Sequence, residues 1–383
     1  MTDVSSIRDS PAPPRVARPP AQPADRDTRT QALLAALEER ILVLDGATGT
    51  MLQSYELTAA DFGGPELEGC NEHLCVTRPD VVRGVSIAYL AAGCDVVETN
   101  SFGGTPIVLA EYGLAHEAFE HNRLAAALAR EACAEFDAPG RLRFVAGSMG
   151  PTTKAISVTG GVTFEALSET FRLQALGLMA GGADYLLVET CQDTRNIKAA
   201  LLGCEAAFAE CGWRLPVAVS VTIEPTGTML AGQDAEALAV SLAHADLLYV
   251  GLNCATGPAL MADHLRTLSE LARTRVACVP NAGLPDEEGK YRESPEQFRE
   301  VFGRFLGEGW LNLVGGCCGT RPAHVTALAE LVAGKPPRAI PHHQRALVSG
   351  IEATELTADN RPLLVGERTN VLGSRDFKAK IAA

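Results

Sequence analysis

The chain has 383 residues, of which 46% are hydrophobic and 21% charged, with a formal net charge of −14. This length and apolar content are sufficient for a large buried core, whereas an acidic chain without a basic run argues against nucleic acids and anionic membranes as partners. No apolar run reaches about 18 residues, so no transmembrane helix is expected. The 11 cysteines form no compact disulfide framework, which indicates reduced thiols and a cytoplasmic location.

The N-terminal region, residues 1–30, is rich in Pro, Ala, Arg and Asp. It lacks the apolar segment of a secretory signal, and we expect a disordered leader. A helix is predicted over residues 31–40 and a strand over 41–44. The strand ends in Asp45-Gly46-Ala47-Thr48-Gly49-Thr50, a carboxylate followed by a glycine-containing loop. No Lys follows the last Gly and no G-x-G-x-x-G occurs here, which excludes a P-loop and a dinucleotide-binding loop.

From this point strands and helices alternate along the chain. The strands are short apolar runs without period-two alternation, a pattern typical of parallel sheets buried on both faces. Eight such units over about 300 residues predict a (β/α)₈ TIM barrel rather than an open doubly wound sheet. We place this barrel at residues 31–334. The remaining strands are expected at 94–98, 144–148, 185–188, 217–222, 246–252, 276–279 and 310–314, and the helices at 80–92, 121–136, 164–181, 193–211, 234–245, 257–274, 294–307 and 321–333.

Polar residues gather at the carboxyl ends of these strands. In a TIM barrel these ends meet on one face, where the chemistry is done. The predicted active-site face therefore collects residues from most of the strands: Asp45, Asn100, Ser148, Glu189, Thr222, Cys254, Asn281, Cys317 and Cys318.

Three cysteines on this face suggest a metal site. Cys317 and Cys318 lie between glycines, which allow the backbone to leave strand geometry so that both sulfurs turn toward one point. Cys254 follows the strand at 246–252. Three thiolates leave the fourth position of Zn²⁺ open, as in catalytic zinc sites, and such a site suits a substrate thiol bound as thiolate. The alternative is a disulfide between the two adjacent cysteines and an unrelated buried Cys254.

Other residues at the same face suit an amino-acid substrate. The carboxylates of Asp45 and Glu189 would receive an ammonium group; the alternative is helix capping or a surface ion pair. The amides of Gly49 and Thr50 would hold a carboxylate, since backbone N–H groups in a turn favour anions. Asn253 would position either its neighbouring cysteine or the substrate, or is an ordinary polar residue at a strand end.

Five segments of the chain stand out together. They are Asp45-Gly46-Ala47-Thr48-Gly49-Thr50, Gly69-Cys70-Asn71-Glu72, Glu98-Thr99-Asn100-Ser101-Phe102-Gly103-Gly104, Asn253-Cys254 and Gly315-Gly316-Cys317-Cys318-Gly319. With these segments, the chain resembles the homocysteine S-methyltransferase family over about residues 33–334. More narrowly, it is similar to the homocysteine-binding module of cobalamin-dependent methionine synthases. This resemblance implies zinc bound by Cys254, Cys317 and Cys318, and homocysteine contacts at Asp45, Gly49, Thr50 and Glu189.

The last 49 residues, 335–383, differ in character from the barrel. Residues 335–359 are interpreted as a linker with a weak strand or helix, and a strand is expected over 361–370. The stretch 366–375, GERTNVLGSR, is similar to the start of the folate (pterin)-binding domain of the same enzymes. The folate and cobalamin domains are expected on a separate chain or on a part missing from this sequence.

The resemblance implies transfer of a methyl group to the thiol of L-homocysteine to give L-methionine. The expected donor is methylcobalamin, supplied in trans after it is charged from 5-methyltetrahydrofolate. One alternative is the same fold acting without cobalamin on betaine or S-methylmethionine. Another, from a different class, is a non-catalytic zinc-sensing or scaffold protein.

Overall fold

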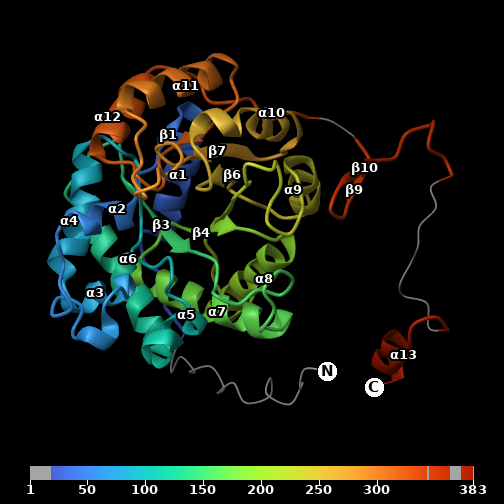
Figure 1. Ribbon diagram of the computed structural model, residues 1–383, viewed down its shortest axis with the longest axis horizontal. Helices are drawn as coiled ribbons and strands as arrows, with labels where there is room; N and C mark the ends of the chain where they lie inside the picture. The colour runs from blue at the N-terminus through green and yellow to red at the C-terminus, as the bar shows by residue number, and fades with distance from the viewer. Residues whose placement is uncertain (1–18, 343–344, 363–371, 383) are drawn as a thin grey trace.

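Eight parallel strands form a barrel in the computed structural model, which describes residues 19–342, 345–362 and 372–382 (Figure 1). The sheet order is β1-β8-β7-β6-β5-β4-β3-β2, and a parallel bridge between Leu44 and Val96 joins the two ends. The predicted (β/α)₈ barrel is therefore confirmed. The strands are β1 Leu42–Val43, β2 Val96–Glu98, β3 Phe144–Met149, β4 Tyr185–Cys191, β5 Val217–Val221, β6 Tyr249–Asn253, β7 Arg275–Val279 and β8 Leu313–Val314.

Helices surround this sheet in Figure 1, and several begin at the capping residues that the sequence offers. Thr163 accepts a hydrogen bond from Ala166 N at the start of α7, and Ser294 forms a capping box with Gln297 before α11. The larger helices are α1 Arg26–Glu39, α4 Pro79–Ala91, α6 Ala118–Ala134, α7 Phe164–Gly181, α8 Thr194–Cys211, α9 Ala235–Leu242, α10 Ala262–Leu271, α11 Pro295–Gly307 and α12 Pro322–Val332. Shorter ones are α2 Thr48–Gln53, α3 Leu74–Thr77, α5 Pro106–Leu109, η2 Pro65–Leu67, η3 Asn71–His73, η4 Ala110–Tyr112, η5 Ala115–Glu117 and η6 Pro258–Met261.

Helix α1 closes the barrel at the amino ends of the strands. Its Leu33 and Leu37 are buried in the cluster that fills the barrel interior, together with Phe144, Tyr185 and Tyr249. The helix begins at Arg26 and not at residue 31, so residues 26–30, which we expected in the leader, are helical. Residues 1–18 of the expected leader lie outside the described part of the chain.

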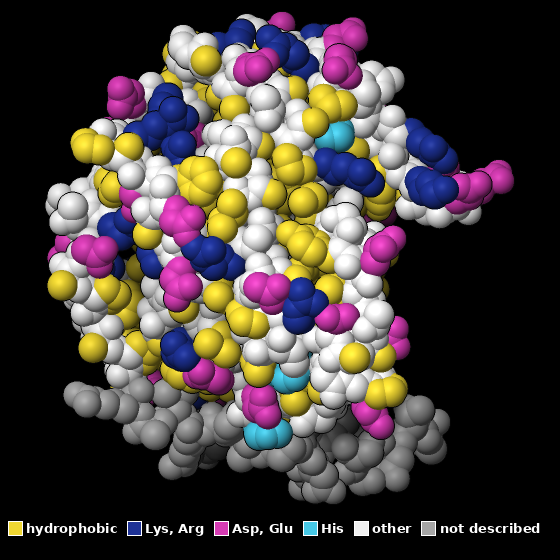
Figure 2. Space-filling view, turned by 90° about the vertical axis from the view of Figure 1, so that its left-hand side faces the viewer, with side chains coloured by type: hydrophobic (Ala, Val, Ile, Leu, Met, Phe, Trp, Pro, Cys, Tyr) yellow, Lys and Arg dark blue, Asp and Glu magenta, His cyan; other side chains and the backbone are white. Residues whose placement is uncertain are grey.

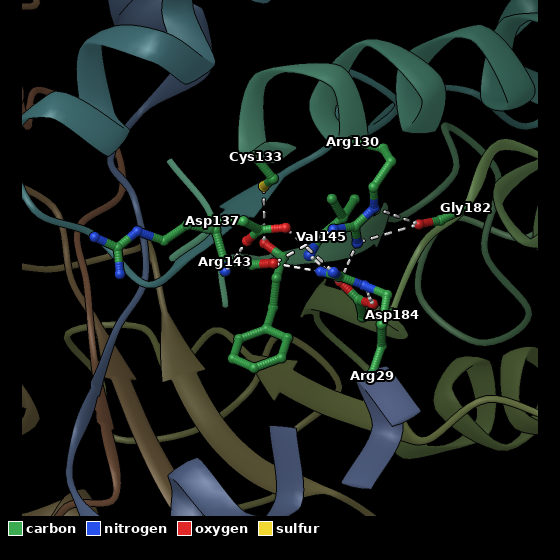
Figure 3. A network of polar contacts seen from close by, with 9 residues as sticks. Arg29, Arg130, Cys133, Asp137, Arg143, Val145, Gly182 and Asp184 are labelled. Carbon is green, nitrogen blue, oxygen red and sulfur yellow. Dashed lines mark hydrogen bonds and ion pairs between the residues drawn. The ribbon is translucent and has the colours of Figure 1, made fainter. Parts of the chain in front are cut away.

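A network of charges holds α1 to the strands at this end (Figure 3). Arg29 Nε donates to Asp184 Oδ1 at 2.8 Å, and Arg130 of α6 pairs with the same carboxylate. Val145 N of β3 also donates to Asp184, at 2.7 Å. Asp184 is 5% exposed. These bonds give residues 26–30 tertiary partners, which explains why a polar segment that resembles a leader is helical.

The segment after the barrel is anchored by Arg338. Its guanidinium donates to the backbone carbonyls of Ser269, Ala272 and Thr274, and its own carbonyl accepts from Asn312 Nδ2 at 2.9 Å. Two antiparallel strands, β9 Leu347–Ser349 and β10 Ala353–Glu355, then lie beside α9 (Figure 1). The strand expected over 361–370 falls largely outside the described residues, and the last helix is α13 Arg375–Ala382.

The surface is mixed in charge. On the face shown in Figure 2, Lys and Arg side chains are interspersed with Asp and Glu. Within the described ranges, no helix has both the length and the apolar character needed to cross a membrane.

Candidate active site

The three predicted cysteines meet at the carboxyl ends of the barrel strands. Cys254 follows β6, and Cys317 and Cys318 follow β8. One ligand atom from each lies within 4.8 Å of the other two, and the Sγ atoms of Cys254 and Cys318 are 3.8 Å apart. Two sulfurs at about 2.3 Å from a tetrahedral zinc would be about 3.8 Å apart. All three are free thiols in this structure, so the adjacent pair forms no disulfide here.

The glycines around the adjacent cysteines are needed mainly for close packing. A Cβ on Gly315 would lie 2.8 Å from Leu44 Cβ, and one on Gly316 would collide with Thr320. Only Gly319, at φ +80°, has the left-handed backbone that favours glycine. We expected the glycines on both sides of the cysteine pair to let the backbone leave strand geometry. Only Gly319, after the pair, has a backbone conformation that requires this freedom.

Backbone hydrogen bonds connect the cysteine loops to each other and to the end of β7. Cys254 N donates to Val279 O at 3.1 Å, Cys317 N to Pro280 O at 2.8 Å, and Ala282 N to Cys318 O at 2.9 Å. Cys254 itself has φ +56°, an uncommon conformation for a residue with a side chain. This backbone persists because both flanking loops hold it, as expected for a functional position.

The thiols affect one another's ionisation. Hydrogen bonds from Cys254 and then Cys317 lower the pKa of Cys318 to about 3. The pKa of Cys317 is raised, because its hydrogen bonds with Cys254 and Cys318 favour the protonated form. Cys318 is thus a thiolate at neutral pH, the form in which cysteine binds metals.

The residues present fit a zinc ion. Three soft sulfur atoms lie within 4.8 Å of one another, and the Cys254–Cys318 pair is at the spacing of two ligands of a tetrahedral zinc. Nearby, Asn281 follows β7 and is 2% exposed, and among the described residues its Oδ1 has no hydrogen-bond partner. Tyr291 covers the loop from the other side, since a side chain on Gly319 would overlap its ring. The cluster therefore offers three sulfur donors, and the loop after β7 carries a buried amide oxygen without a hydrogen-bond partner among the described residues.

Two buried carboxylates, Asp45 and Glu189, and the half-buried Glu98 lie at the same end of the barrel. Asp45 Oδ2 accepts from Glu98 N at 3.0 Å, while Ser148 Oγ donates to Glu189 Oε1. Glu98, Glu189 and Ser220 line one small cavity. Burial raises the pKa of all three carboxyls, and that of Glu189 to about 7. A cation entering this pocket would be bound strongly, because it would relieve the cost of burying negative charge.

The remaining predicted substrate contacts are Asn253, Gly49 and Thr50. Both amide atoms of Asn253 bond to Thr190, with Oδ1 accepting from its backbone N at 3.0 Å and Nδ2 donating to Oγ1 at 2.7 Å. Gly49 and Thr50 lie in the first turn of α2 rather than in a loop. No atom lies within 4 Å of where a Gly49 Cβ would be, while Thr50 Oγ1 accepts from Gly319 N at 3.0 Å. Asn253 therefore shapes the end of β4, and Thr50 links α2 to the cysteine loop.

Sequence reasoning gave no role to Glu98, Ser220 or Tyr291. Glu98 ends β2 as Asp45 follows β1, so the strand-end signal that selected Asp45 was also present there. Ser220 lies within β5, and Tyr291 comes from a long loop, so no local pattern marks either. Only the three-dimensional arrangement brings them to the site.

Comparison with known proteins identifies relatives across the barrel. The model of the family described as homocysteine S-methyltransferase matches residues 42–332. A methionine synthase from Mycobacterium tuberculosis is 42% identical over 364 residues, which cover 94% of this chain and 30% of the relative. A methionine synthase from Mycobacterium leprae is also 42% identical, over 92% of this chain and 30% of its own. The chain thus spans about a third of the length of these relatives.

Solved structures show the same architecture. A homocysteine methyltransferase from Escherichia coli, MmuM, superposes in its oxidized form with a TM-score of 0.63 at 24% identity. The alignment covers 79% of this chain and 99% of that chain. Its metallated form gives a TM-score of 0.62 over the same shares. At 24% sequence identity, this likeness is evidence for the fold alone.

Proposed function

Because the chain belongs to the homocysteine S-methyltransferase family, we propose that it transfers a methyl group to the sulfur of L-homocysteine, giving L-methionine. The observation that carries this proposal is the convergence of Cys254, Cys317 and Cys318 beside a small pocket lined by two carboxylates, Glu98 and Glu189. A thiol-bearing amino acid matches both parts of the site. A scaffold or sensor protein would need the sulfur cluster but not the carboxylate pocket.

We propose that the three cysteines hold zinc, which would lower the pKa of the substrate thiol and present the sulfur as a nucleophile. The protein's part is to fix the three sulfurs in place through the interlocked loops after β6, β7 and β8. Tyr291 and the loop that carries it cover the cluster on one side. The site is thereby kept rigid, so that the substrate sulfur meets the methyl donor in one orientation.

The amino-acid end of homocysteine is assigned to the neighbouring groups. Glu189 and Asp45 receive the ammonium group, and the first-turn amides at Gly49 and Thr50 receive the carboxylate. Glu98 lines the pocket beside Glu189. The substrate is then bound at both ends, and its sulfur forms a bond to the methyl carbon as the carbon's bond to the donor breaks.

For the donor we propose methylcobalamin, held by another polypeptide or by domains beyond this barrel and recharged from 5-methyltetrahydrofolate. Support comes from the two methionine synthases, in which 70% of the relative lies outside the match, leaving room for such domains. The reaction is assigned to the cytoplasm, which agrees with the free state of all 11 cysteines. Betaine or S-methylmethionine is the competing donor.

A donor assay tests this function. The purified chain is incubated with homocysteine and, in parallel, with free methylcobalamin, betaine or S-methylmethionine, and methionine is quantified by mass spectrometry. We expect product from methylcobalamin alone. Product from betaine or S-methylmethionine in the absence of any corrinoid would reassign the donor, and no product from any of the three would contradict the proposed activity.

A further inference from the structure

A second group of metal-binding side chains lies away from the cysteines, on η3 and the start of α6. We propose that His73, Glu117 and His121 form a second site for a divalent transition metal, of which Zn²⁺ is the expected occupant. One ligand atom from each residue lies within 4.8 Å of the other two. His121 is 1% exposed and His73 9%. None of these residues lies on the strand ends that carry the cysteines.

The orientation of His121 is already that of a metal ligand. Its Nδ1 lies 3.0 Å from the backbone carbonyl of Glu117. A carbonyl can only accept, so Nδ1 carries the hydrogen and Nε2 presents a lone pair. Metal-binding histidines commonly have this arrangement, with one ring nitrogen held by a carbonyl and the other free to ligate.

The lone pair of His121 Nε2 faces His73. The two nitrogens, His121 Nε2 and His73 Nδ1, are 2.8 Å apart, and the rings are stacked with centroids 5.1 Å apart. One hydrogen occupies the space between them.

Metal binding at this pair requires only a local change. The hydrogen of His73 moves from Nδ1 to Nε2, which leaves Nδ1 free as the second ligand and releases no proton. Two nitrogen ligands of a tetrahedral zinc are about 3.3 Å apart, given a bond length of about 2.0 Å. The rings must therefore separate by about 0.5 Å and turn so that both lone pairs point at the metal, a movement within the range of side-chain adjustment.

Glu117 supplies the third ligand and the path from solvent. Its side chain is 40% exposed, and one of its carboxylate oxygens lies within 4.8 Å of a ring nitrogen of each of the two histidines. On its other side it faces His116 Nε2 at 3.5 Å, so three of the chain's eight histidines surround one carboxylate. In the described ranges no Lys or Arg pairs with Glu117. Two imidazoles and a carboxylate are a ligand set that zinc and its neighbours in the first transition row accept.

The site would also fix a loop at the barrel mouth. Glu72, next to His73, accepts a hydrogen bond from Gly103 N at 2.7 Å, and Asn100 Nδ2 donates to Asn71 O at 2.7 Å. A metal joining η3 to α6 would thus restrain the segment 100–104 after β2. The expected role is structural, because the metal lies behind this loop and not in the carboxylate pocket.

Cobalt titration of metal-free protein tests the proposal. The triple variant Cys254→Ser, Cys317→Ser, Cys318→Ser removes the sulfur site, so any Co²⁺ that remains bound must use other ligands. We expect this variant to bind one equivalent with a d–d spectrum and no sulfur-to-cobalt charge-transfer band. Adding Glu117→Gln or His73→Gln should weaken that binding at least about tenfold, since even groups behind the ligands contribute about 10–100-fold to affinity.

The matched control is His244→Gln, which removes an exposed histidine elsewhere on the surface. It should leave cobalt binding unchanged, and circular dichroism establishes that each variant is folded. Zinc should compete for the site with the same stoichiometry. If the folded triple variant binds no Co²⁺ or Zn²⁺, or if both ligand variants bind it as tightly as the parent, the second site does not exist.

Discussion

Each of the three cysteines has a partner in the cluster, so loss of one sulfur should affect the other two. We predict that Cys317→Ala reduces bound zinc after purification by at least about tenfold, because two thiolates alone make an incomplete zinc site. Plasma mass spectrometry of the purified variant measures the metal. Cys211→Ala is the control, since this half-buried thiol lies on α8 outside the site. Full zinc content in the Cys317 variant would remove the ligand assignment.

Glu189 gives the site a dependence on pH. Burial raises its pKa to about 7, so the carboxyl is largely protonated below that value and charged above it. Only the charged form attracts an ammonium group, and we therefore predict that KM for homocysteine falls as pH rises through about 7. Because the pKa of Glu189 is raised in the folded state, its contribution to the free energy of unfolding is greatest at low pH. This contribution is lost as pH rises through about 7.

The comparison that isolates this effect is Glu189→Gln, which keeps the shape and removes the titration. Steady-state kinetics from about pH 6 to 8 should show a higher KM that no longer changes at this step. Glu210→Gln, on the surface end of α8, should retain the parent profile. A parent-like pH profile in the Glu189 variant would place the titrating group elsewhere.

Residue choice was predictable where the fold itself brings side chains together. Strand ends of a parallel barrel meet on one face, so Asp45, Glu189 and Cys254 could be selected from sequence position alone. Glu98 obeyed the same rule but was given no role, because its segment supported only the resemblance. Asn253 was expected to position Cys254 or the substrate, or to be an ordinary polar residue at a strand end; in the structure its amide bonds to Thr190, whose φ is +55°.

At the level of elements, α1 illustrates how a charge network can define a helix. Asp184 pairs with Arg29 and Arg130 and accepts from a strand amide. We predict that Asp184→Asn lowers the free energy of unfolding by about 3 kcal/mol, because two arginines lose a buried partner. This value lies at the lower end for a buried ion pair because Arg130 is 22% exposed.

Urea unfolding followed by circular dichroism measures this loss. The control is Glu205→Gln, which breaks the exposed pair with Arg214 and should change stability by less than about 1 kcal/mol. Equal stability of the Asp184 variant and the parent would show that α1 is held by Leu33 and Leu37 alone.

The predicted bounds of helices and strands agree with the observed ones where the sequence offers a clear capping residue or a continuous apolar run. The predicted range of α7 is the observed one, and Thr163 caps it. Helices α6, α9 and α10 begin or end some residues away from their predicted bounds, and α1 and α2 differ from expectation for tertiary reasons. The start of α1 depends on Arg29, and α2 forms over a Thr-Gly-Thr segment of low helix propensity, supported by the bond from Gly319 to Thr50.

For the whole molecule, the proposed function implies a division of labour between this barrel and folate- and cobalamin-binding domains. The cysteines and carboxylates all lie within residues 42–332, the range that the family matches. We predict that the chain forms methionine slowly from free methylcobalamin, because the donor is not held at a high effective concentration. It should not use 5-methyltetrahydrofolate until a protein with folate and cobalamin domains is added. Efficient turnover of 5-methyltetrahydrofolate by the isolated chain would contradict this dependence.

The most direct test of the account measures methionine formation from homocysteine and methylcobalamin before and after metal removal. The chain is assayed as purified, after treatment with a chelator, and after zinc is returned. We predict that product formation is lost with the chelator and recovers with zinc, and that Cys318→Ala stays inactive throughout. Undiminished methionine formation in the chelated protein, or in the Cys318 variant, would contradict a zinc-dependent homocysteine methyltransferase built on these three cysteines.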